Sequence, residues 1–264
     1  MSLQASYCDY DPDAVDLPAI ALNVDVTANE SEMPVHRHRK GQLVLALRGG
    51  VTCEVSDALW MVPPQCGVWI PGGMQHSNRA TANARICFLF VEPGATNLPD
   101  TCCTLSISPL VREMILYLAG TDPQDGYDAH TRRLVRVLLD ELARMPVERL
   151  HWALASDPKV RRIAQALVRD PADRSSLAQW AGSVAMSERS LARLIVKETG
   201  LSFGRWRQQL HLIVALRELA AGMSVQQVSA ELGYESVTAF ITMFKKSLGR
   251  PPAKYFAALK GGGD

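Results

Sequence analysis

The sequence predicts an α+β chain with an all-β N-terminal domain, a helical linker and an all-α C-terminal domain. Short apolar runs separated by Gly and Pro fill residues 18–105, which is typical of a β-sandwich or barrel. From Pro109 onward, apolar residues recur every three or four positions, which indicates helices. A repeated helical pattern then occupies about the last hundred residues. We therefore place the domains at residues 1–107, 108–157 and 158–260.

The β prediction rests on six apolar runs that end at turn residues. Prolines and glycines such as Gly49, Pro63, Pro71 and Pro93 separate these runs. Proline cannot donate to a strand ladder and glycine suits tight turns, so both residue types mark strand ends. The predicted strands are residues 20–26, 43–47, 51–55, 59–62, 67–70 and 85–91.

The linker is predicted to contain two helices. The apolar positions of the first are Leu110, Met114, Leu116, Tyr117 and Leu118. Those of the second, which ends before Pro146, are Leu134, Val137, Leu138, Leu142 and Met145. The second helix is the preferred contact of a homodimer, and packing within one chain is the alternative that the sequence leaves open.

Composition excludes several classes of protein. The chain has 264 residues, of which 47% are hydrophobic and 21% charged, as in ordinary globular proteins. It contains no apolar run of the roughly 18 residues that span a membrane. The acidic N-terminus has no apolar signal core, so we expect a cytoplasmic protein that does not enter membranes. The six cysteines form no C-x-x-C pair, and we interpret them as reduced thiols.

The net charge of +1 conceals an asymmetry between the two halves. Residues 1–158 contain 12 Lys+Arg and 19 Asp+Glu, for a net charge of −7. Residues 159–263 contain 16 Lys+Arg and 7 Asp+Glu, for a net charge of +9. This distribution is expected when only the C-terminal half binds a polyanion.

A group of histidines lies in the predicted β domain: His36 and His38, with Gln42 four residues further on and His76 downstream. Residues i and i+2 of a strand share a face, so His36 and His38 can point into one cavity. Three imidazoles and one oxygen suit a divalent transition metal, although an amide is a weaker ligand than a carboxylate. The sequence leaves open a site for one such metal, of unknown identity, and a metal-free ligand pocket.

The spacing of these residues resembles the cupin barrels. Their first motif is His-x-His, then Glu, then Gly, and here the run is His36, His38, Gln42 and Gly49. The segment from Pro71 through Gly73 to His76 resembles their second motif. The chain departs from the pattern twice: Gln42 replaces the usual Glu, and Gln65 stands where the second motif usually opens with Gly.

A ligand cavity in the β domain would be lined by its large apolar side chains. Trp60, Trp69 and Phe88 are the candidates, and a role in the core is the alternative. Two functions are open for the chain. One is ligand sensing by the β domain, and the alternative is a metal-dependent cupin enzyme whose basic C-terminal half is an accessory DNA-binding tail. No residue pattern outside the histidine group supports catalysis, so we predict no catalytic residues and no enzyme.

The helical repeat consists of two helix-turn-helix units. In the first, Ser176 and Ser187 are predicted N-caps, and Gly200 ends the second helix. Leu191, Leu194 and Ile195 form its buried stripe, which leaves a polar outward face. Arg suits bidentate contact with guanine, and Lys and Ser suit phosphates. The predicted DNA contacts are Ser187, Arg189, Ser190, Arg193 and Lys197.

The second unit begins at Ser224 and places Gly233 in its turn. The buried positions repeat, but the outward ones do not, because the offset aligns Arg189 and Arg193 with Thr238 and Thr242. The predicted contacts of this unit are Ser236, Thr238, Thr242, Lys245 and Lys246. Nineteen helical residues between the units would hold the two recognition helices about one DNA turn apart.

These motifs resemble the AraC/XylS family of transcription regulators. The segment from Val228 to Ser236, followed by Phe240, Gly249 and Tyr255, is similar to the family signature. The resemblance implies a ligand-responsive regulator that binds double-stranded DNA as a dimer and responds to a small-molecule effector or metal, with RNA polymerase as a further partner. The family usually has Arg where Thr242 stands, so we expect the second unit to read bases weakly. The effector, the operator, and the choice between activator and repressor stay open.

Overall fold

The computed structural model divides the chain into two compact units. One comprises Met1–Ser56 and Trp60–Leu150, and the other comprises Asp57–Leu59 and His151–Asp264. The residues that the structure describes are 10–26, 31–55, 58–62, 65–81, 84–124, 126–148, 151–153, 155 and 157–260. Cys8 and most of the acidic N-terminal segment lie outside them.

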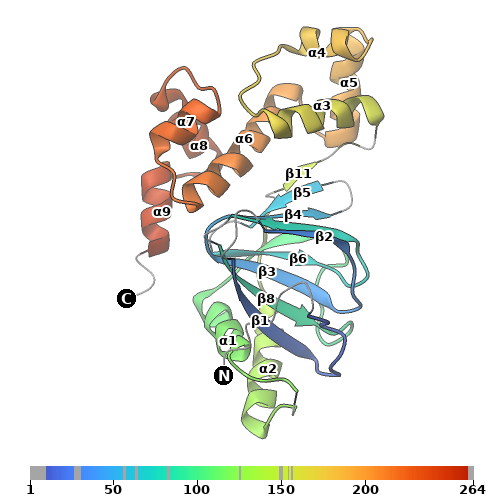
Figure 1. Cartoon of the computed structure of the whole chain (residues 1–264), viewed down its shortest axis with the longest axis vertical. Helices are drawn as coiled ribbons and strands as arrows, with labels where there is room; N and C mark the ends of the chain where they lie inside the picture. Colours follow the sequence, from blue (N-terminus) through green and yellow to red (C-terminus); the bar gives the residue numbers. More distant parts are fainter. Residues whose placement is uncertain are drawn as a thin grey trace. The chain divides into compact units, whose positions relative to one another are not determined.

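The first unit is built on two antiparallel sheets and two helices (Figure 1). One sheet has the order β1-β8-β3-β6-β9-β10, and the other contains the order β5-β4-β7-β2. The strands are β1 Ala19–Asp25, β2 Ser31–His36, β3 Gly41–Arg48, β4 Val51–Val55, β5 Ala58–Met61, β6 Cys66–Ile70, β7 His76–Ala80, β8 Arg85–Val91, β9 Cys103–Ser106 and β10 Val147–Glu148. Each of the six predicted strands therefore corresponds to an observed one, whereas β2, β7, β9 and β10 were not predicted.

Strand register assigns each residue of the larger sheet to one of its two faces. Gln42 lies opposite both Phe90 of β8 and Ile70 of β6, so these three side chains share a face. Leu43 lies opposite Leu89 and Trp69, and these side chains share the other face. The first face contains the side chain of Gln42, whose Oε1 lies 3.0 Å from His38 Nε2, and is therefore the face that carries the candidate site.

The two linker helices belong to the first unit. Helix α1 (Pro109–Ala119) packs on β1 and β8, and α2 (Ala129–Leu142) packs on α1. Leu138 and Leu142 are fully buried in this packing, whereas Val137 is 49% exposed. The packing places both helices in the first compact unit instead of a separate linker at 108–157, and it buries Leu138 and Leu142 within one chain.

The second unit is helical apart from β11 (His151–Ala153) (Figure 1). Its helices are α3 Pro158–Arg169, α4 Leu177–Ser183, α5 Glu188–Thr199, α6 Phe203–Ala220, α7 Val225–Glu231, α8 Val237–Leu248 and α9 Pro252–Lys260. The two helix-turn-helix units are thus α4–α5 and α7–α8, joined by α6, as predicted. Trp206 of α6 is fully buried, stacks on Trp152 at 4.8 Å between ring centroids and anchors the core of this unit.

The local signals of the repeat appear as predicted. Ser176 and Ser224 each form a capping box with the glutamine three residues later. The two recognition helices, α5 and α8, end at glycines in the left-handed conformation. The turn of the second unit has Gly233 at φ +68°, and the corresponding turn residue of the first unit, Ala185, adopts φ +51°. The two turns therefore have the same backbone shape, although only one uses glycine.

The described cysteines are unpaired thiols. Burial raises the pKa of Cys53, Cys66 and Cys87 to about 12, which keeps these sulfurs protonated and unreactive. This state agrees with the interpretation of reduced, structural cysteines. Among the described residues, no helix is both long and apolar enough to cross a membrane.

Candidate functional site

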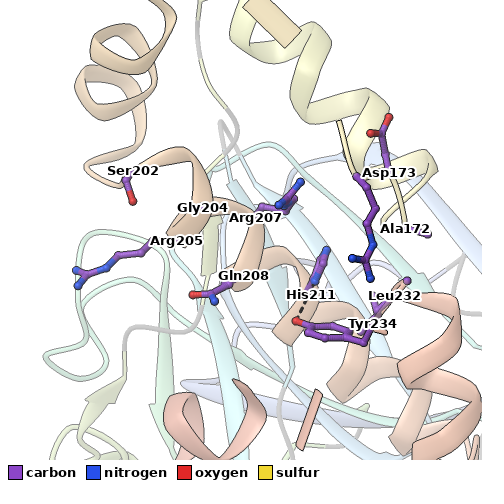
Figure 2. A pocket seen from close by; sticks show the side chains of 12 residues that line it. Ala172, Asp173, Ser202, Gly204, Arg205, Arg207, Gln208, His211, Leu232 and Tyr234 are labelled. Carbon is purple, nitrogen blue, oxygen red and sulfur yellow. Dashed lines mark hydrogen bonds between the residues drawn. The ribbon is translucent and has the colours of Figure 1, made fainter. Parts of the chain in front are cut away.

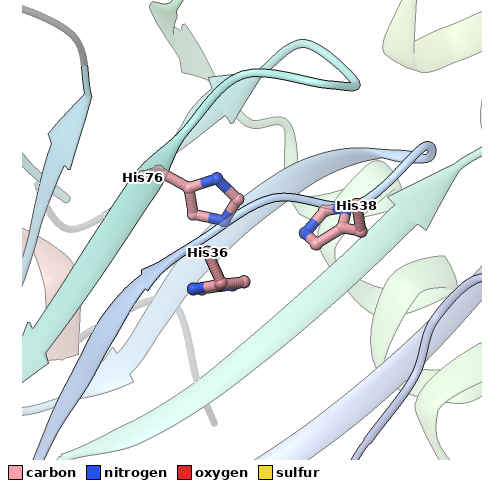
Figure 3. A group of neighbouring side chains, drawn as sticks. All are labelled: His36, His38 and His76. Carbon is pink, nitrogen blue, oxygen red and sulfur yellow. The ribbon is translucent and has the colours of Figure 1, made fainter.

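Three histidines meet in the first unit (Figure 3). His36 ends β2 and lies opposite His76, the first residue of β7. His38 lies in the loop before β3, so the His-x-His motif spans a strand end and not a continuous strand as the sequence suggested. One ring nitrogen from each histidine lies within 4.8 Å of the others, which is close enough for a single cation to be shared.

The backbone fixes the orientation of all three rings. The Nδ1 atom of each ring lies close to a backbone carbonyl oxygen two residues away, at 2.9 Å for His36, 2.6 Å for His38 and 2.9 Å for His76. A carbonyl oxygen only accepts, so Nδ1 carries the hydrogen in each ring, and a neutral imidazole then has its lone pair on Nε2. A backbone carbonyl that holds the far ring nitrogen is the usual support for a histidine that ligates a metal.

Several polar atoms around the ring Nε2 positions are poorly matched as hydrogen-bond partners. Gln42 Oε1 lies 3.0 Å from His38 Nε2, so two acceptors face each other when His38 is neutral. Among the described residues, the buried Nε2 atoms of His76 and Gln42 have no hydrogen-bond partner. A cation between the rings would satisfy the two acceptors, whereas an amide group turned by 180° would let the Gln42 NH2 group donate to His38 Nε2. The three ring nitrogens and the Gln42 oxygen therefore fit the ligands of a transition metal.

Burial favours the neutral, metal-binding form of two of these rings. It lowers the pKa of His76 to about 4, because the charged imidazolium is poorly solvated there, with smaller contributions from the two neighbouring rings. Burial also lowers the pKa of His36. Both rings are therefore unprotonated at pH 7, as a metal ligand must be.

The loop that carries His38 is anchored by Lys40. Its ammonium group is fully buried, donates to the carbonyl of Val15 at 2.6 Å and lies 3.4 Å from a Glu92 carboxylate oxygen. Asp13 accepts from the backbone N–H groups of Arg39 and Lys40. Lys40 is thus a structural residue that holds this loop in place.

Two of the three candidate pocket aromatics, Phe88 and Trp69, lie on opposite faces of the larger sheet. Phe88 lies opposite Val44, and Val44 is two residues after Gln42 on the same strand. Because alternate residues of a strand share a face, Phe88 lies on the face of Gln42. Trp69 lies on the opposite face, covers Gly41 and donates from its indole nitrogen to the carbonyl of Pro99 at 2.8 Å. Trp60 is buried in β5. The structure therefore separates Trp69 from the histidine face.

The DNA-binding candidates lie on the outward faces of α5 and α8. Arg189, Arg193 and Lys197 are exposed on α5, and Ser190 is half-buried. Their neighbours Leu191 and Ile195 are fully buried, so the predicted division into an inner and an outer face is present. Ser187 caps α5 by accepting from the backbone N–H of Ser190, and its hydroxyl lies within hydrogen-bond distance of the Ser190 hydroxyl.

The outward face of α8 differs from that of α5 in its chemistry. Thr238, Thr242, Lys245 and Lys246 are exposed there. The Thr242 hydroxyl donates to the carbonyl of Thr238 at 2.8 Å, which leaves the methyl groups of both threonines and the two lysines as the outward groups. Ser236 is the N-cap of the helix. This face suits thymine methyl groups and phosphates more than bidentate base contacts.

Helix α6 and a histidine join the two helix-turn-helix units. The 18 residues of α6 correspond to about 27 Å, against roughly 34 Å between successive major grooves. His211 of α6 bonds to the carbonyl of Pro171 at 3.0 Å through Nε2 and to the Tyr234 hydroxyl at 3.1 Å through Nδ1 (Figure 2). The loop before α4 and the turn before α8 are therefore tied to one side chain, which sequence patterns did not reveal.

The tie through His211 requires a neutral ring. The Pro171 carbonyl accepts from Nε2–H, so Nδ1 accepts from the Tyr234 hydroxyl. Burial and the nearby positive charge of Arg207 lower the pKa of His211 to about 4. Protonation would place a hydrogen on Nδ1 and would remove the bond that Tyr234 donates.

This lowered pKa predicts acid sensitivity of the helical unit. Between about pH 6.5 and 4 the unfolded chain binds a proton at His211 that the folded chain does not, so the free energy of unfolding falls as the pH falls. We expect up to about 3 kcal/mol of loss over that window from a shift of this size. Denaturant unfolding followed by helical circular dichroism at several pH values measures it. His211→Gln should flatten the pH dependence, whereas His130→Gln, at an exposed position, should leave it unchanged.

Comparison with known proteins gives a consistent result. A family model described as an AraC-like ligand binding domain matches residues 24–169, and one described as a helix-turn-helix domain matches residues 180–258. The HTH-type transcriptional regulator NimR of Escherichia coli (strain K12) is 56% identical over 250 residues, which cover 95% of this chain and 92% of NimR. RipA of Corynebacterium glutamicum is 32% identical over 45% of this chain and 36% of its own length.

Among solved structures, ToxT of Vibrio cholerae O395 aligns with 92% of this chain and 98% of its own, at 10% identity and a TM-score of 0.40. The sequence matches, together with a β unit and a double helix-turn-helix unit, define a DNA-binding transcription regulator with a separate ligand-binding domain. The chain belongs to the AraC family of transcription regulators.

Proposed function

We propose that this regulator senses a divalent transition metal, or a small molecule held by that metal, at His36, His38 and His76 with Gln42 beside them. The observation that carries the proposal is the convergence of the three rings: one ring nitrogen of each lies within 4.8 Å of the others, and the Nδ1 atom of each is held by a backbone carbonyl. A metal held there would supply a Lewis-acidic point to which an anionic or nitrogen-containing effector could bind. Imidazole ligands suit Zn, Cu, Fe and Ni, so the histidines limit the candidates to these four metals.

Sensing requires that the bound ligand favour one arrangement of the regulator over another. His36 and His76 pair β2 with β7, whereas His38 belongs to the loop that Lys40 anchors. A ligand shared by all three histidines would therefore tie this loop to the strand pair. The ratio of the ligand's affinities for the DNA-competent and DNA-incompetent states would set how far it shifts DNA binding.

Metal analysis of the purified full chain tests the site. We expect stoichiometric metal after exposure to Zn²⁺ or Ni²⁺, and its loss in His36→Ala and in His76→Ala. His130→Ala is the matched control, because His130 is an exposed histidine of the same unit. Saturating metal should also raise the melting temperature of the wild type, since a ligand at 100 times its Kd adds about 2.7 kcal/mol.

Two results would count against the metal proposal. Wild-type protein that stays metal-free and gains no stability would favour the metal-free pocket, with the Gln42 amide bonded to His38. Equal metal content in the wild type, His36→Ala and His76→Ala would place the metal elsewhere. Because a buried histidine can be needed for folding, His36→Gln at the half-buried position serves as the milder variant.

We further propose how the remaining partners are used. Arg189 and Arg193 read bases, and Lys197, Lys245 and Lys246 contact phosphates.

The exposed apolar side chains Leu110, Tyr117 and Val137 on α1 and α2 are the candidate surface for a homodimer in the cytoplasm. RNA polymerase is the further partner of such a regulator. Substrate turnover by the metal-loaded protein would be needed to support the enzyme alternative, and no second feature of the described residues favours it.

A further inference from the structure

A basic hollow lies between the loop before the first helix-turn-helix unit and the turn of the second (Figure 2). Its volume is about 450 Å³. One wall is the loop before α4, residues 172–174; the opposite wall is the turn between α7 and α8, residues 232–234. The floor is the first half of α6, from Ser202 to His211. All of these residues belong to the helical unit, so the hollow is independent of the histidine site of the first unit.

Positive charge exceeds negative charge around the hollow. Arg174, Arg205 and Arg207 line it, together with a single acidic residue, Asp173. The Asp173 carboxylate accepts from the backbone N–H of Ser175 at 2.6 Å, so it is engaged in the loop. Arg174 has an ion-pair partner at the rim, Glu235 at 3.3 Å, but both side chains are more than half exposed, so that pair is weak.

Arg207 is held in place at the floor. It is half-buried, its guanidinium carbon lies 5.3 Å from the centroid of the Phe203 ring, and it donates to the carbonyl of Ser175. A guanidinium group has five donors in a planar fork, so Arg207 has further N–H groups to offer. Stacking of this kind orders the side chain before a ligand binds, which reduces the entropy lost on binding.

The other polar groups of the hollow add donors without adding negative charge. Ser202 occupies the N-cap position of α6, but its hydroxyl makes no capping bond to the first N–H groups of this 18-residue helix. Gly204 follows in the first turn, with open space beside its Cα. His211 and Tyr234 bond to each other and stay neutral at pH 7. Guanidinium groups with helix N–H groups form the donor set that phosphate prefers.

We propose that this hollow binds a phosphate group. The two recognition helices read successive major grooves, so a sugar-phosphate backbone passes between them. In three-helix DNA-binding domains the loop before the helix-turn-helix contacts the DNA backbone, and the start of the recognition helix lies at the bases. Here the loop is one wall of the hollow, and the turn leading to α8 is the other. The DNA backbone is therefore the favoured source of the phosphate, and a free phosphorylated molecule is the alternative source. This proposal does not depend on metal binding at the histidines, but it rests on the proposed binding of DNA.

The salt dependence of DNA affinity tests the proposal. An operator is first selected from random DNA with the wild-type full chain. Affinity for it is then measured between 50 and 200 mM salt for the wild type, Arg205→Gln and Arg207→Gln. Each lost phosphate contact should lower the slope of log K against log salt by about 1 and weaken operator and random DNA equally. Arg162→Gln removes the same charge at an exposed position of α3 and should change the slope less.

A second measurement separates the two phosphate sources and controls for folding. Inorganic phosphate is added to each protein at constant ionic strength, and the melting temperature is recorded. A reduced slope in both variants identifies the DNA backbone as the source. Unchanged slopes, with stabilisation by phosphate that both variants lose, identify a free phosphate ligand. Unchanged slopes without phosphate stabilisation overturn the proposal. Arg207→Lys, which keeps the charge, should recover part of the slope, and unchanged metal content in all variants keeps this result separate from the metal test.

Discussion

Replacing Arg189 and Arg193 by alanine is expected to remove most sequence-specific binding by the first recognition helix. Both side chains are exposed on the outer face of α5, whose inner face is fixed by the fully buried Leu191 and Ile195. Each lost base contact should cost roughly 1–3 kcal/mol, or about 5- to 150-fold in affinity, and should relax the preference at one base position. Mobility-shift titration on operator and random DNA measures both effects.

The control for this experiment is Lys197→Ala. Lys197 lies in the last turn of the same helix, and as a phosphate contact it should weaken operator and random DNA equally. If the arginine variants also weaken both DNAs equally, α5 contacts only the backbone. If they bind the operator as tightly as the wild type, the first recognition helix is misassigned. Thr238→Ala and Thr242→Ala should change operator binding less, because the hydroxyl of Thr242 is bonded to its own helix.

The helical unit could be predicted closely because its signals are local. N-caps such as Ser187 and Ser236 and the terminal glycines of α5 and α8 act within one or two turns of chain. The apolar stripes then identify which face is buried. The duplication adds a second instance of each signal, so an irregular turn residue such as Ala185 does not obscure the pattern.

The strands that carry two of the histidines were harder to predict. Strands β2 and β7 contain few apolar residues, with the sequences SEMPVH and HSNRA, so no apolar run identifies them. The face assigned to Trp69 likewise depends on strand register, which is set by pairing between distant segments. The sequence could indicate that His36, His38 and His76 belong together, but only the structure shows the carbonyl groups that orient them.

The tie at His211 illustrates a second kind of information that sequence patterns lack. Its partners Pro171 and Tyr234 lie 40 and 23 residues away in the chain. Nothing in the periodicity of α6 distinguishes a histidine that bonds two loops from one exposed on the helix surface. The basic hollow depends on the same juxtaposition, since its walls come from segments about 60 residues apart.

Trp206→Ala is expected to destabilise the helical unit by about 3–5 kcal/mol, the usual cost of truncating a buried tryptophan. The side chain is fully buried, stacks on Trp152 with an interplanar angle of 16° and also contacts Phe203. The indole nitrogen of Trp152 donates to the backbone carbonyl of Trp206 at 2.8 Å. The substitution keeps that acceptor but leaves a cavity beside Trp152, so lost packing should contribute to the cost.

The repeat supplies a matched comparison for this substitution. Tyr255 occupies the position of the second copy that corresponds to Trp206, packs against Phe244 at 5.7 Å and is only half-buried. Tyr255→Ala should therefore cost less than Trp206→Ala in denaturant unfolding followed by circular dichroism. Because α6 joins the two helix-turn-helix units, loss of Trp206 should lower DNA affinity for operator and random DNA together. A Trp206→Ala protein with wild-type stability would show that Trp152 and Phe203 close the cavity, and that the stacked pair is not what holds α6 in place.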